Sequence, residues 1–224
     1  MRDAHDGTVD TLQAIFEHNR NWADRMRKAD PSVFDRTGTV QRPRCLWIGC
    51  SDSRVVPNAV TGLGIGELFV HRNIGNVVPV GDVGVGAVLE FAVQVLKVRH
   101  VIVCGHTDCG AARAALAAPQ PRALEQWVLH LRDVARRHEA LLGAVADEPD
   151  RVARLAALNV IRQVENVAAA QAVREAWRTG RSLSVHGWMY DVRDGMLADL
   201  GAVISSPGDV HPACAVARRA LAIG

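Results

Sequence analysis

The sequence lacks the signals that mark a membrane, secreted or nucleic-acid-binding protein. Its longest apolar stretch, residues 83–98, is interrupted by Glu90 and Lys97, which makes it a poor membrane span. The N-terminal residues 1–22 carry acidic side chains throughout and no unbroken apolar region, unlike a secretory signal. A net charge of +2 with scattered lysines and arginines is too small for a nucleic-acid footprint. We expect a cytoplasmic protein with no membrane span and no nucleic-acid partner.

The chain also lacks a disulfide framework, internal repeats and low-complexity segments. Its five cysteines are odd in number and have no framework-like spacing, so metal binding or burial is their more common use in an intracellular chain. A length of 224 residues, 49% of them hydrophobic, can bury one sizeable core. We predict a single domain over residues 1–224. In it, residues 1–40 form an N-terminal helical arm, 41–206 the core and 207–224 a C-terminal tail.

Apolar patterning predicts helices that alternate with short buried strands. Helical periodicity marks residues 9–22 (with Thr8 or Asp10 as N-cap), 83–98, 110–118, 124–135 and 152–167, the last of these ending near Gly180. Short apolar runs predict strands at 45–52, 67–73, 100–107, 183–192 and 201–206. Strands that are apolar on both faces and alternate with helices favour a mainly parallel sheet covered on both sides. The expected fold class is α/β, with about four parallel strands and an antiparallel edge strand.

Two of the predicted strands end in residues that suit a metal ion. Cys50 ends the run CLWIG, and His106 and Cys109 follow the run HVIVCG. In open α/β sheets, ligands bind beyond the carboxyl ends of the strands, where the strand order reverses. Two thiolates and one imidazole suit zinc, and three protein ligands are typical of a catalytic site because the fourth position stays open. Cys50, His106 and Cys109 therefore predict a zinc site.

The segment CSDSRV, residues 50–55, adds an acid and a base to this site. Two thiolates cancel the charge of the metal, so water bound there needs help from a neighbour to lose its proton. Asp52 can accept a hydrogen bond from that water, and Arg54 can hold Asp52 through a bidentate contact and keep its pKa low. Without the metal ligands nearby, the pair would be interpreted as a simple ion pair at a strand end. Buried cysteines commonly act as small hydrophobic residues, which we expect of Cys45, Cys104 and Cys214.

Several segments together resemble the β-class carbonic anhydrases. CSDSRV at 50–55, GELFVHRNIGNVV at 66–78 and CGHTDCGA at 104–111 are similar to three signature segments of that family, in the same order. LNVIRQVENV at 158–167 and VHGWMYDVRDGML at 185–197 resemble its later segments. The resemblance covers nearly the whole chain, and three matched segments are far more specific than any one of them.

The resemblance implies a zinc-dependent lyase, carbonic anhydrase, that interconverts carbon dioxide with bicarbonate and a proton. It implies one zinc ion per subunit, held by Cys50, His106 and Cys109, with a zinc-bound hydroxide as nucleophile. The Asp52–Arg54 dyad would be catalytic, and Gln41 matches a glutamine that binds bicarbonate across a subunit interface. Family members are dimers or multiples of dimers, so a homodimer or a dimer of dimers is implied.

Some bacterial members of the family also have a non-catalytic bicarbonate site made of a tryptophan, an arginine and a tyrosine. Trp47 and Arg72 match the first two, and we place Phe91 where the tyrosine would be. A phenyl ring has no hydroxyl group for a hydrogen bond, so inhibition by bicarbonate is an open question. Two other functions also stay open: a non-catalytic zinc-binding relative, and a hydrolase of carbon disulfide or carbonyl sulfide.

Overall fold

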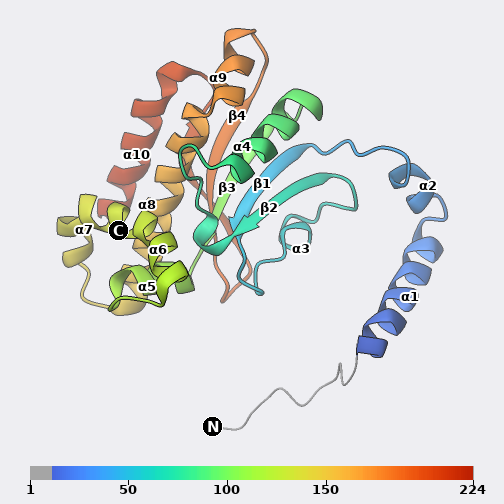
Figure 1. Cartoon of the computed structure of the whole chain (residues 1–224), viewed down its shortest axis with the longest axis horizontal. Coiled ribbons are helices and arrows are strands. Elements are labelled where there is room, and N and C mark those ends of the chain that lie inside the picture. Colours follow the sequence, from blue (N-terminus) through green and yellow to red (C-terminus); the bar gives the residue numbers. More distant parts are fainter. Residues whose placement is uncertain (1–11, 224) are drawn as a thin grey trace. The chain divides into compact units, whose positions relative to one another are not determined.

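The computed structural model describes residues 12–223. The chain divides into two compact units, Met1–Gln41 and Arg42–Gly224 (Figure 1). The first unit contains α1 (Leu12–Ala29) and α2 (Val33–Thr37), which meet where the ring of Trp22 packs edge-on against Phe34. No residue of α1 is buried, although the helix is amphipathic as its sequence predicts. The N-cap candidates Thr8 and Asp10 lie outside the described residues.

The second unit is built on one five-stranded sheet with the order β2-β1-β3-β4-β5. The strands are β1 (Cys45–Cys50), β2 (Leu68–Asn73), β3 (His100–His106), β4 (Ser184–Tyr190) and β5 (Leu197–Ile204). β1 pairs in parallel with β2 and β3, and β3 pairs in parallel with β4. β5 is an antiparallel edge strand. The predicted α/β class, with four parallel strands and an antiparallel edge, is confirmed.

Most of the helices pack on one face of this sheet. In Figure 1, α8 (Glu148–Ala169) and α10 (Val210–Ile223) lie side by side against β4 and β5. With this face they bury a large apolar cluster, to which β1 contributes Leu46 and Ile48. The other helices of the unit are α3 (Pro57–Thr61), α4 (Val83–Glu90), α5 (Gly110–Leu116), α6 (Arg122–Arg137), α7 (Glu139–Gly143) and α9 (Gln171–Arg178), with short turns of other helix types at Ile74–Asn76, Phe91–Val95 and Pro207–Asp209.

A smaller apolar cluster lies on the opposite face of the sheet. Cys45 and Trp47 of β1 and Ile102 and Cys104 of β3 are buried there. This difference between the faces follows from the two-residue alternation of a strand, since Leu46 and Ile48 point one way and their neighbours the other. The interior strand β1, which lies between β2 and β3, is buried along its whole length. Apolar residues on both faces of β1 therefore match the prediction from the sequence.

Two glycines let α8 approach the sheet closely. A Cβ atom on Gly105 would lie 2.6 Å from Val160 Cγ2, and one on Gly187 would lie 3.2 Å from Val160 Cγ1. A contact of 2.6 Å would force Val160 away from the strands, and a contact of 3.2 Å would require a smaller shift. Because Gly105 directly precedes His106, this close approach also sets the position of the strand end that carries His106.

Three segments differ from the sequence-based expectation. The helix predicted over 83–98 changes at Phe91 into a π-helical turn that ends at Val95. The helix expected to run to near Gly180 breaks at Ala170, whose φ of −62° and ψ of 140° are extended, and α9 follows as a separate helix. Residues 207–224, expected to be a tail, contain α10. Cys214 and Ala217 of α10 are buried in the large cluster, so packing rather than local pattern stabilises this helix.

Candidate metal centre

The fold brings the predicted ligands together at the carboxyl edge of the parallel strands. From β1 the chain forms β2 on one side of β1 and then crosses to form β3 on the other side, so the order reverses between β1 and β3. Cys50 ends β1 and His106 ends β3, and Cys109 lies in the turn between β3 and α5. Such a reversal point is where open α/β sheets bind ligands.

The side chains of Cys50, His106 and Cys109 form a compact, buried group. Their Sγ and ring nitrogen atoms lie within 4.8 Å of one another, and among the described residues no other group has this arrangement. His106 is fully buried, yet its Nε2 atom has no hydrogen-bond partner. A buried polar atom without a partner is costly unless something binds it. Two thiols and a bare imidazole nitrogen fit a tetrahedral zinc ion.

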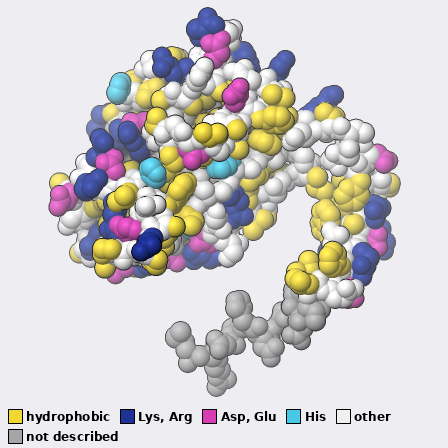
Figure 2. All heavy atoms as spheres, in the orientation of Figure 1, with side chains coloured by type: hydrophobic (Ala, Val, Ile, Leu, Met, Phe, Trp, Pro, Cys, Tyr) yellow, Lys and Arg dark blue, Asp and Glu magenta, His cyan; other side chains and the backbone are white. Residues whose placement is uncertain are grey.

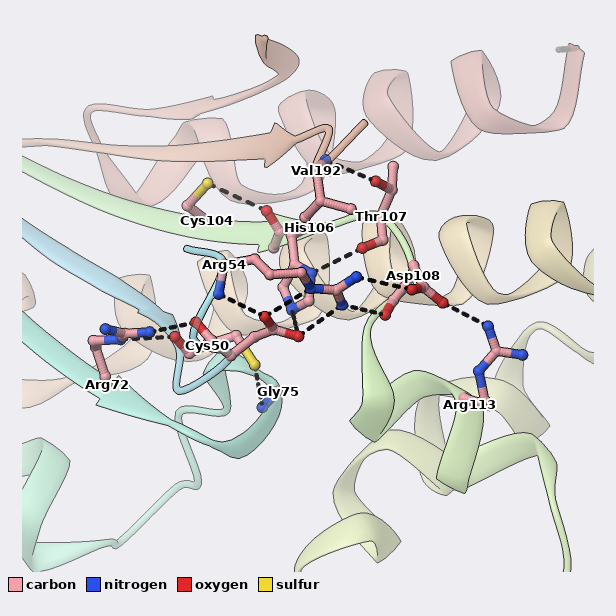
Figure 3. A network of polar contacts seen from close by, with 12 residues as sticks. Cys50, Arg54, Arg72, Gly75, Cys104, His106, Thr107, Asp108, Arg113 and Val192 are labelled. Carbon is pink, nitrogen blue, oxygen red and sulfur yellow. Dashed lines mark hydrogen bonds and ion pairs between the residues drawn. The ribbon is translucent and has the colours of Figure 1, made fainter. Parts of the chain in front are cut away.

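The orientation of His106 is fixed from its other ring nitrogen. His106 Nδ1 donates to the backbone carbonyl of Thr107 at 2.8 Å (Figure 3). This contact places the proton on Nδ1 and leaves the lone pair of Nε2 for a metal, as outer hydrogen bonds commonly do for histidine ligands. Thr107 is held in turn, because its Oγ1 donates to Asp191 at 3.0 Å and accepts from the Val192 N–H at 3.1 Å. The end of β4 thus supports the ligand loop.

The two thiols of the group differ in acidity. A hydrogen bond from the Cys109 thiol lowers the pKa of Cys50, and the Gly75 N–H, 3.4 Å from Cys50 Sγ, lowers it further. The same contact with Cys50, together with burial, raises the pKa of Cys109. The hydrogen bond between the two thiols favours deprotonation of one of them, and a bound divalent cation would favour deprotonation of both. The negative charge of a thiolate at this position would attract a cation.

Gly75 is needed for the contact with Cys50. Its φ of +75° lies in the left-handed region, and a Cβ atom there would lie 2.9 Å from the Ala111 side chain. Two buried side chains of α8 hold the surrounding loop: Asn159 Nδ2 donates to the Gly75 carbonyl at 2.8 Å, and Gln163 accepts from the Val78 N–H at 2.9 Å. The sequence analysis assigned no role to Gly75, Asn159 or Gln163. The polar side chains of Asn159 and Gln163 within the apolar segment LNVIRQVENV were a signal that could have identified them.

Asp52 and Arg54 form a bidentate ion pair at the mouth of the group. Arg54 Nε donates to Asp52 Oδ1 at 3.0 Å, and Arg54 Nη2 donates to Asp52 Oδ2 at 2.8 Å. The guanidinium group holds the pKa of Asp52 far below its usual range, so this carboxylate is ionised at neutral pH. Asp52 Oδ2 lies 3.9 Å from His106 Nε2. The carboxylate therefore faces the space in front of the three candidate ligands.

Trp47 and Arg72 lie on the face of the sheet that carries the smaller cluster. β1 and β2 pair so that Gly49 is opposite Arg72, and Trp47 is two residues before Gly49. The Trp47 indole N–H is buried without a partner, and Arg72 donates to the carbonyls of Cys50 at 2.9 Å and Asp52 at 2.6 Å. Phe91 instead contacts Phe69, which packs against the large cluster on the opposite face. Its placement beside Trp47 and Arg72 was therefore wrong.

The tyrosine that shares a face with Trp47 is Tyr190. It packs against the cluster of Cys45, Trp47, Val55, Ile102 and Cys104. Tyr190 follows at the end of β4, far from Trp47 in sequence, so local spacing could not relate the two. The sequence analysis put Phe91 at the tyrosine position and so expected no hydroxyl group near Trp47. Tyr190 provides one on the same face of the sheet as Trp47.

Gln41 and the three remaining cysteines lie outside the group of candidate ligands. Gln41 is exposed and is the last residue of the first unit. Cys45, Cys104 and Cys214 are free and buried, and burial raises the pKa of each of their thiols. They match the expectation of small hydrophobic residues. None of these four belongs to the Cys50, His106 and Cys109 group.

Comparison with known proteins agrees with the resemblance seen in the sequence. The family model for carbonic anhydrase matches residues 45–197. A carbonic anhydrase from Emericella nidulans is 43% identical over 198 residues, covering 88% of this chain and 86% of the relative. A carbonic anhydrase from Pseudomonas aeruginosa is 41% identical over 178 residues, covering 75% of this chain and 78% of the relative.

Solved structures resemble the chain over the same region. A tetrameric β-carbonic anhydrase from Sordaria macrospora has a TM-score of 0.84 and 37% identity, and the match covers 87% of this chain and 99% of that one. The Coccomyxa β-carbonic anhydrase in complex with acetazolamide has a TM-score of 0.87 and 35% identity, covering 91% and 92%. Within residues 12–223, no helix is long and apolar enough to cross a membrane. The chain therefore belongs to the β-carbonic anhydrase family and is an enzyme that hydrates carbon dioxide reversibly to bicarbonate and a proton.

Proposed function

We propose that Cys50, His106 and Cys109 hold one catalytic zinc ion per subunit. The observation that carries this proposal is the unpartnered Nε2 atom of the fully buried His106 beside two thiols. Zinc at this position would supply Lewis-acid activation of water. Three ligands from the protein leave a fourth position open, which is the arrangement of catalytic rather than structural zinc.

The residues around this site would bind and orient the reactants. Asp52, ionised because of its contacts with Arg54, accepts a hydrogen bond from the attacking oxygen and directs a lone pair of that oxygen toward carbon dioxide. Arg54 keeps the carboxylate charged and in place. Gln41 of a second subunit would bind the oxygens of bicarbonate, in line with its exposure at the end of the first unit.

Stopped-flow measurement of carbon dioxide hydration across pH tests this proposal. On protein whose zinc content has been assayed in the same preparation, we expect one zinc per chain and activity that rises with pH. Because Asp52 stays ionised well below neutral pH, its own titration does not produce this rise. A fully zinc-loaded protein that is inactive at every pH, including alkaline pH, would contradict the proposal and point to another substrate such as carbonyl sulfide.

We propose that the chain works as a homodimer or a dimer of dimers. Hydrophobic side chains gather over α4 and the turns beside it (Figure 2), where Val80, Val83, Phe91 and Val95 are 82%, 84%, 41% and 61% exposed. Leu12, Ile15 and Phe16 of α1 are at least half exposed as well. Exposed apolar side chains that lie together mark a protein interface more often than scattered ones do. A second copy of the chain is the partner favoured by the similarity to a tetrameric relative.

Replacing Val83 with aspartate is expected to dissociate the assembly. Loss of one buried valine costs about 1.5–3 kcal/mol, and a two-fold interface contains the change twice. The dissociation constant should rise by at least about 100-fold, as measured by sedimentation equilibrium. Leu129→Asp on α6, where Leu129 is 48% exposed, is the control and should leave the assembly intact. If Val83→Asp sediments like the wild type, this face is not the interface.

We also propose a second bicarbonate site beside Trp47 and Arg72. A bound anion would give the buried Trp47 N–H a partner and would draw Arg72 away from the carbonyls of Cys50 and Asp52. Added bicarbonate should therefore lower activity, relative to chloride at equal ionic strength. Trp47→Phe removes the N–H group and should weaken this inhibition by about 10-fold. Equal inhibition of the wild type and of Trp47→Phe would show that bicarbonate inhibits the enzyme at another site.

For location we propose the cytoplasm. All five cysteines are free, and two of them belong to the candidate metal centre. Reducing compartments keep thiols in this state, whereas oxidising ones favour disulfides. Fractionation of the native cells with detection by antibody would test the assignment.

A further inference from the structure

Arg54 is bound by two carboxylates rather than one. Besides its contacts with Asp52, its Nη1 atom donates to Asp108 Oδ2 at 3.0 Å and its Nη2 atom donates to the Asp108 carbonyl at 3.1 Å (Figure 3). Asp108 lies between the candidate ligands His106 and Cys109, whereas Asp52 follows Cys50. The guanidinium group of Arg54 therefore ties together the two loops that carry the three candidate ligands.

Asp108 is itself held by a second arginine. Asp108 has a φ of +53°, in the left-handed region that aspartate tolerates better than most residues. Its Oδ2 atom accepts from Arg54, and its Oδ1 atom accepts from Arg113 Nη2 of α5 at 2.5 Å. Figure 3 shows Asp108 between the two guanidinium groups. Arg113 Nη1 donates onward to Glu148, the first residue of α8, at 2.7 Å.

A second pair in the same molecule shows what the extra carboxylate changes. Asp191 and Arg193, after β4, repeat the local geometry of Asp52 and Arg54, with Arg193 N–H, Nε and Nη2 all donating to Asp191. Within residues 12–223, Arg193 forms an ion pair with Asp191 and with no second carboxylate, and its side chain is 76% exposed, against 45% for Arg54. The local Asp-x-Arg turn therefore forms without help, and Asp108 adds a second anchor for Arg54.

This network is too exposed to contribute much to folding. The side chains of Asp108, Arg113 and Glu148 are 49%, 44% and 65% exposed. Exposed ion pairs contribute little to stability because water and salt screen them. We expect the network instead to fix the direction in which Arg54 points, and through Arg54 the direction of the Asp52 carboxylate. Fixing a long side chain from two sides reduces the number of orientations that it adopts.

We propose that Asp108 and Arg113 are positioning residues for carbon dioxide hydration, which hold Arg54 so that Asp52 keeps one orientation at the metal centre. Arg113 acts through Asp108, and Asp108 acts through Arg54. The proposal rests on the catalytic role proposed above for Asp52. It assigns a role in this reaction to Asp108, one of the two residues between His106 and Cys109, and to Arg113, one turn into α5.

The first test compares kinetics of zinc-loaded variants. Asp108→Asn should lower kcat for carbon dioxide hydration by about 10-fold, as loss of an outer partner of a metal site typically does, with KM nearly unchanged. Arg113→Gln should lower kcat less, Arg113→Lys should restore most of it, and the double variant should be no worse than Asp108→Asn alone. Arg178→Gln, which removes an exposed ion pair with Glu175 on α9, is the matched control and should behave like the wild type. Zinc content and melting temperature should stay constant throughout.

The second test does not depend on activity. NMR order parameters of the arginine Nε–H groups, measured on the zinc-loaded protein, should be higher for Arg54 than for Arg193 in the wild type. In Asp108→Asn the value for Arg54 should fall toward that of Arg193. An unchanged order parameter or an unchanged kcat in Asp108→Asn would overturn the proposal, and additive effects in the double variant would remove Arg113 from it. If Asp52→Asn is as active as the wild type, the role of Asp52 itself fails, which is a different result.

Discussion

Replacing Asp52 with asparagine is expected to lower kcat/KM for carbon dioxide hydration by about 10²–10⁴-fold, the usual contribution of a group that handles a proton in the transition state. Asparagine has nearly the same shape, but it is neutral and presents an N–H donor where the carboxylate accepts. It also cannot form the charge-assisted bidentate contact with Arg54, whose two bonds to Asp52 measure 3.0 and 2.8 Å. Stopped-flow assays of the zinc-loaded variant measure the loss.

The matched control is Asp133→Asn. Asp133 lies on α6 and, like Asp52, accepts bonds from arginine side chains, here those of Arg136 and Arg137. Its replacement should leave kcat/KM unchanged. Zinc content should equal that of the wild type in both variants, because neither aspartate belongs to the group of candidate ligands. An Asp52→Asn enzyme within two-fold of the wild type would exclude the proposed role of this carboxylate.

Replacing Cys50 with serine is expected to abolish both zinc binding and activity. A serine hydroxyl stays protonated at neutral pH and is a much poorer zinc ligand than a thiolate. The affinity for zinc should fall by more than the roughly 100-fold that loss of an outer partner costs. Metal analysis, calorimetric zinc titration and the hydration assay on one preparation measure the effect.

Cys104→Ala is the matched control for this loss. Cys104 is buried on β3 in the smaller cluster, whereas Cys50 belongs to the large cluster on the opposite face of the sheet. Its replacement should leave zinc and activity intact.

Because Cys50→Ser could also disturb folding, the wild type should be stripped of zinc by a chelator and then reloaded. Activity and part of the melting temperature should be lost and recovered, since a ligand that binds only the native state stabilises it. Retained activity in zinc-free protein would refute the metal assignment.

The fold class was predictable because the apolar patterns of the strands are local. CLWIGC is buried at every position, and its length and flanking residues indicate a strand in the interior of a sheet. α10 was missed because residues 207–224 begin with proline and glycine and have no clear stripe, and its buried Cys214 and Ala217 depend on α8 and β5 being present. The break at Ala170 was missed for a similar reason, since no proline or glycine marks it.

At the candidate site, the sequence predicted correctly that the three candidate ligands come together and that Asp52 pairs with Arg54, but it did not predict the surroundings of Trp47 correctly. The Asp52–Arg54 pair spans two residues, so its geometry follows from a local turn, and the same turn recurs at Asp191 and Arg193. Phe91 was placed beside Trp47 wrongly, because the alternation of side chains within a strand does not show which distant helix covers which face of the sheet. Tyr190 was overlooked because local spacing does not show that β4, far along the chain, pairs with β3.

The sequence by itself determined the chemistry available to this protein: two thiols and an imidazole at strand ends, an aspartate held by an arginine, and strands apolar enough to be buried. Donor type and short spacing are properties of the chain, so they can be read without a fold. The tertiary structure decided which of these groups meet. Placing β3 beside β1 brings His106 and Cys109 to Cys50, and it brings Asp108 to Arg54. Contacts across such distances depend on strand order and helix packing, which many residues determine together and no single motif encodes.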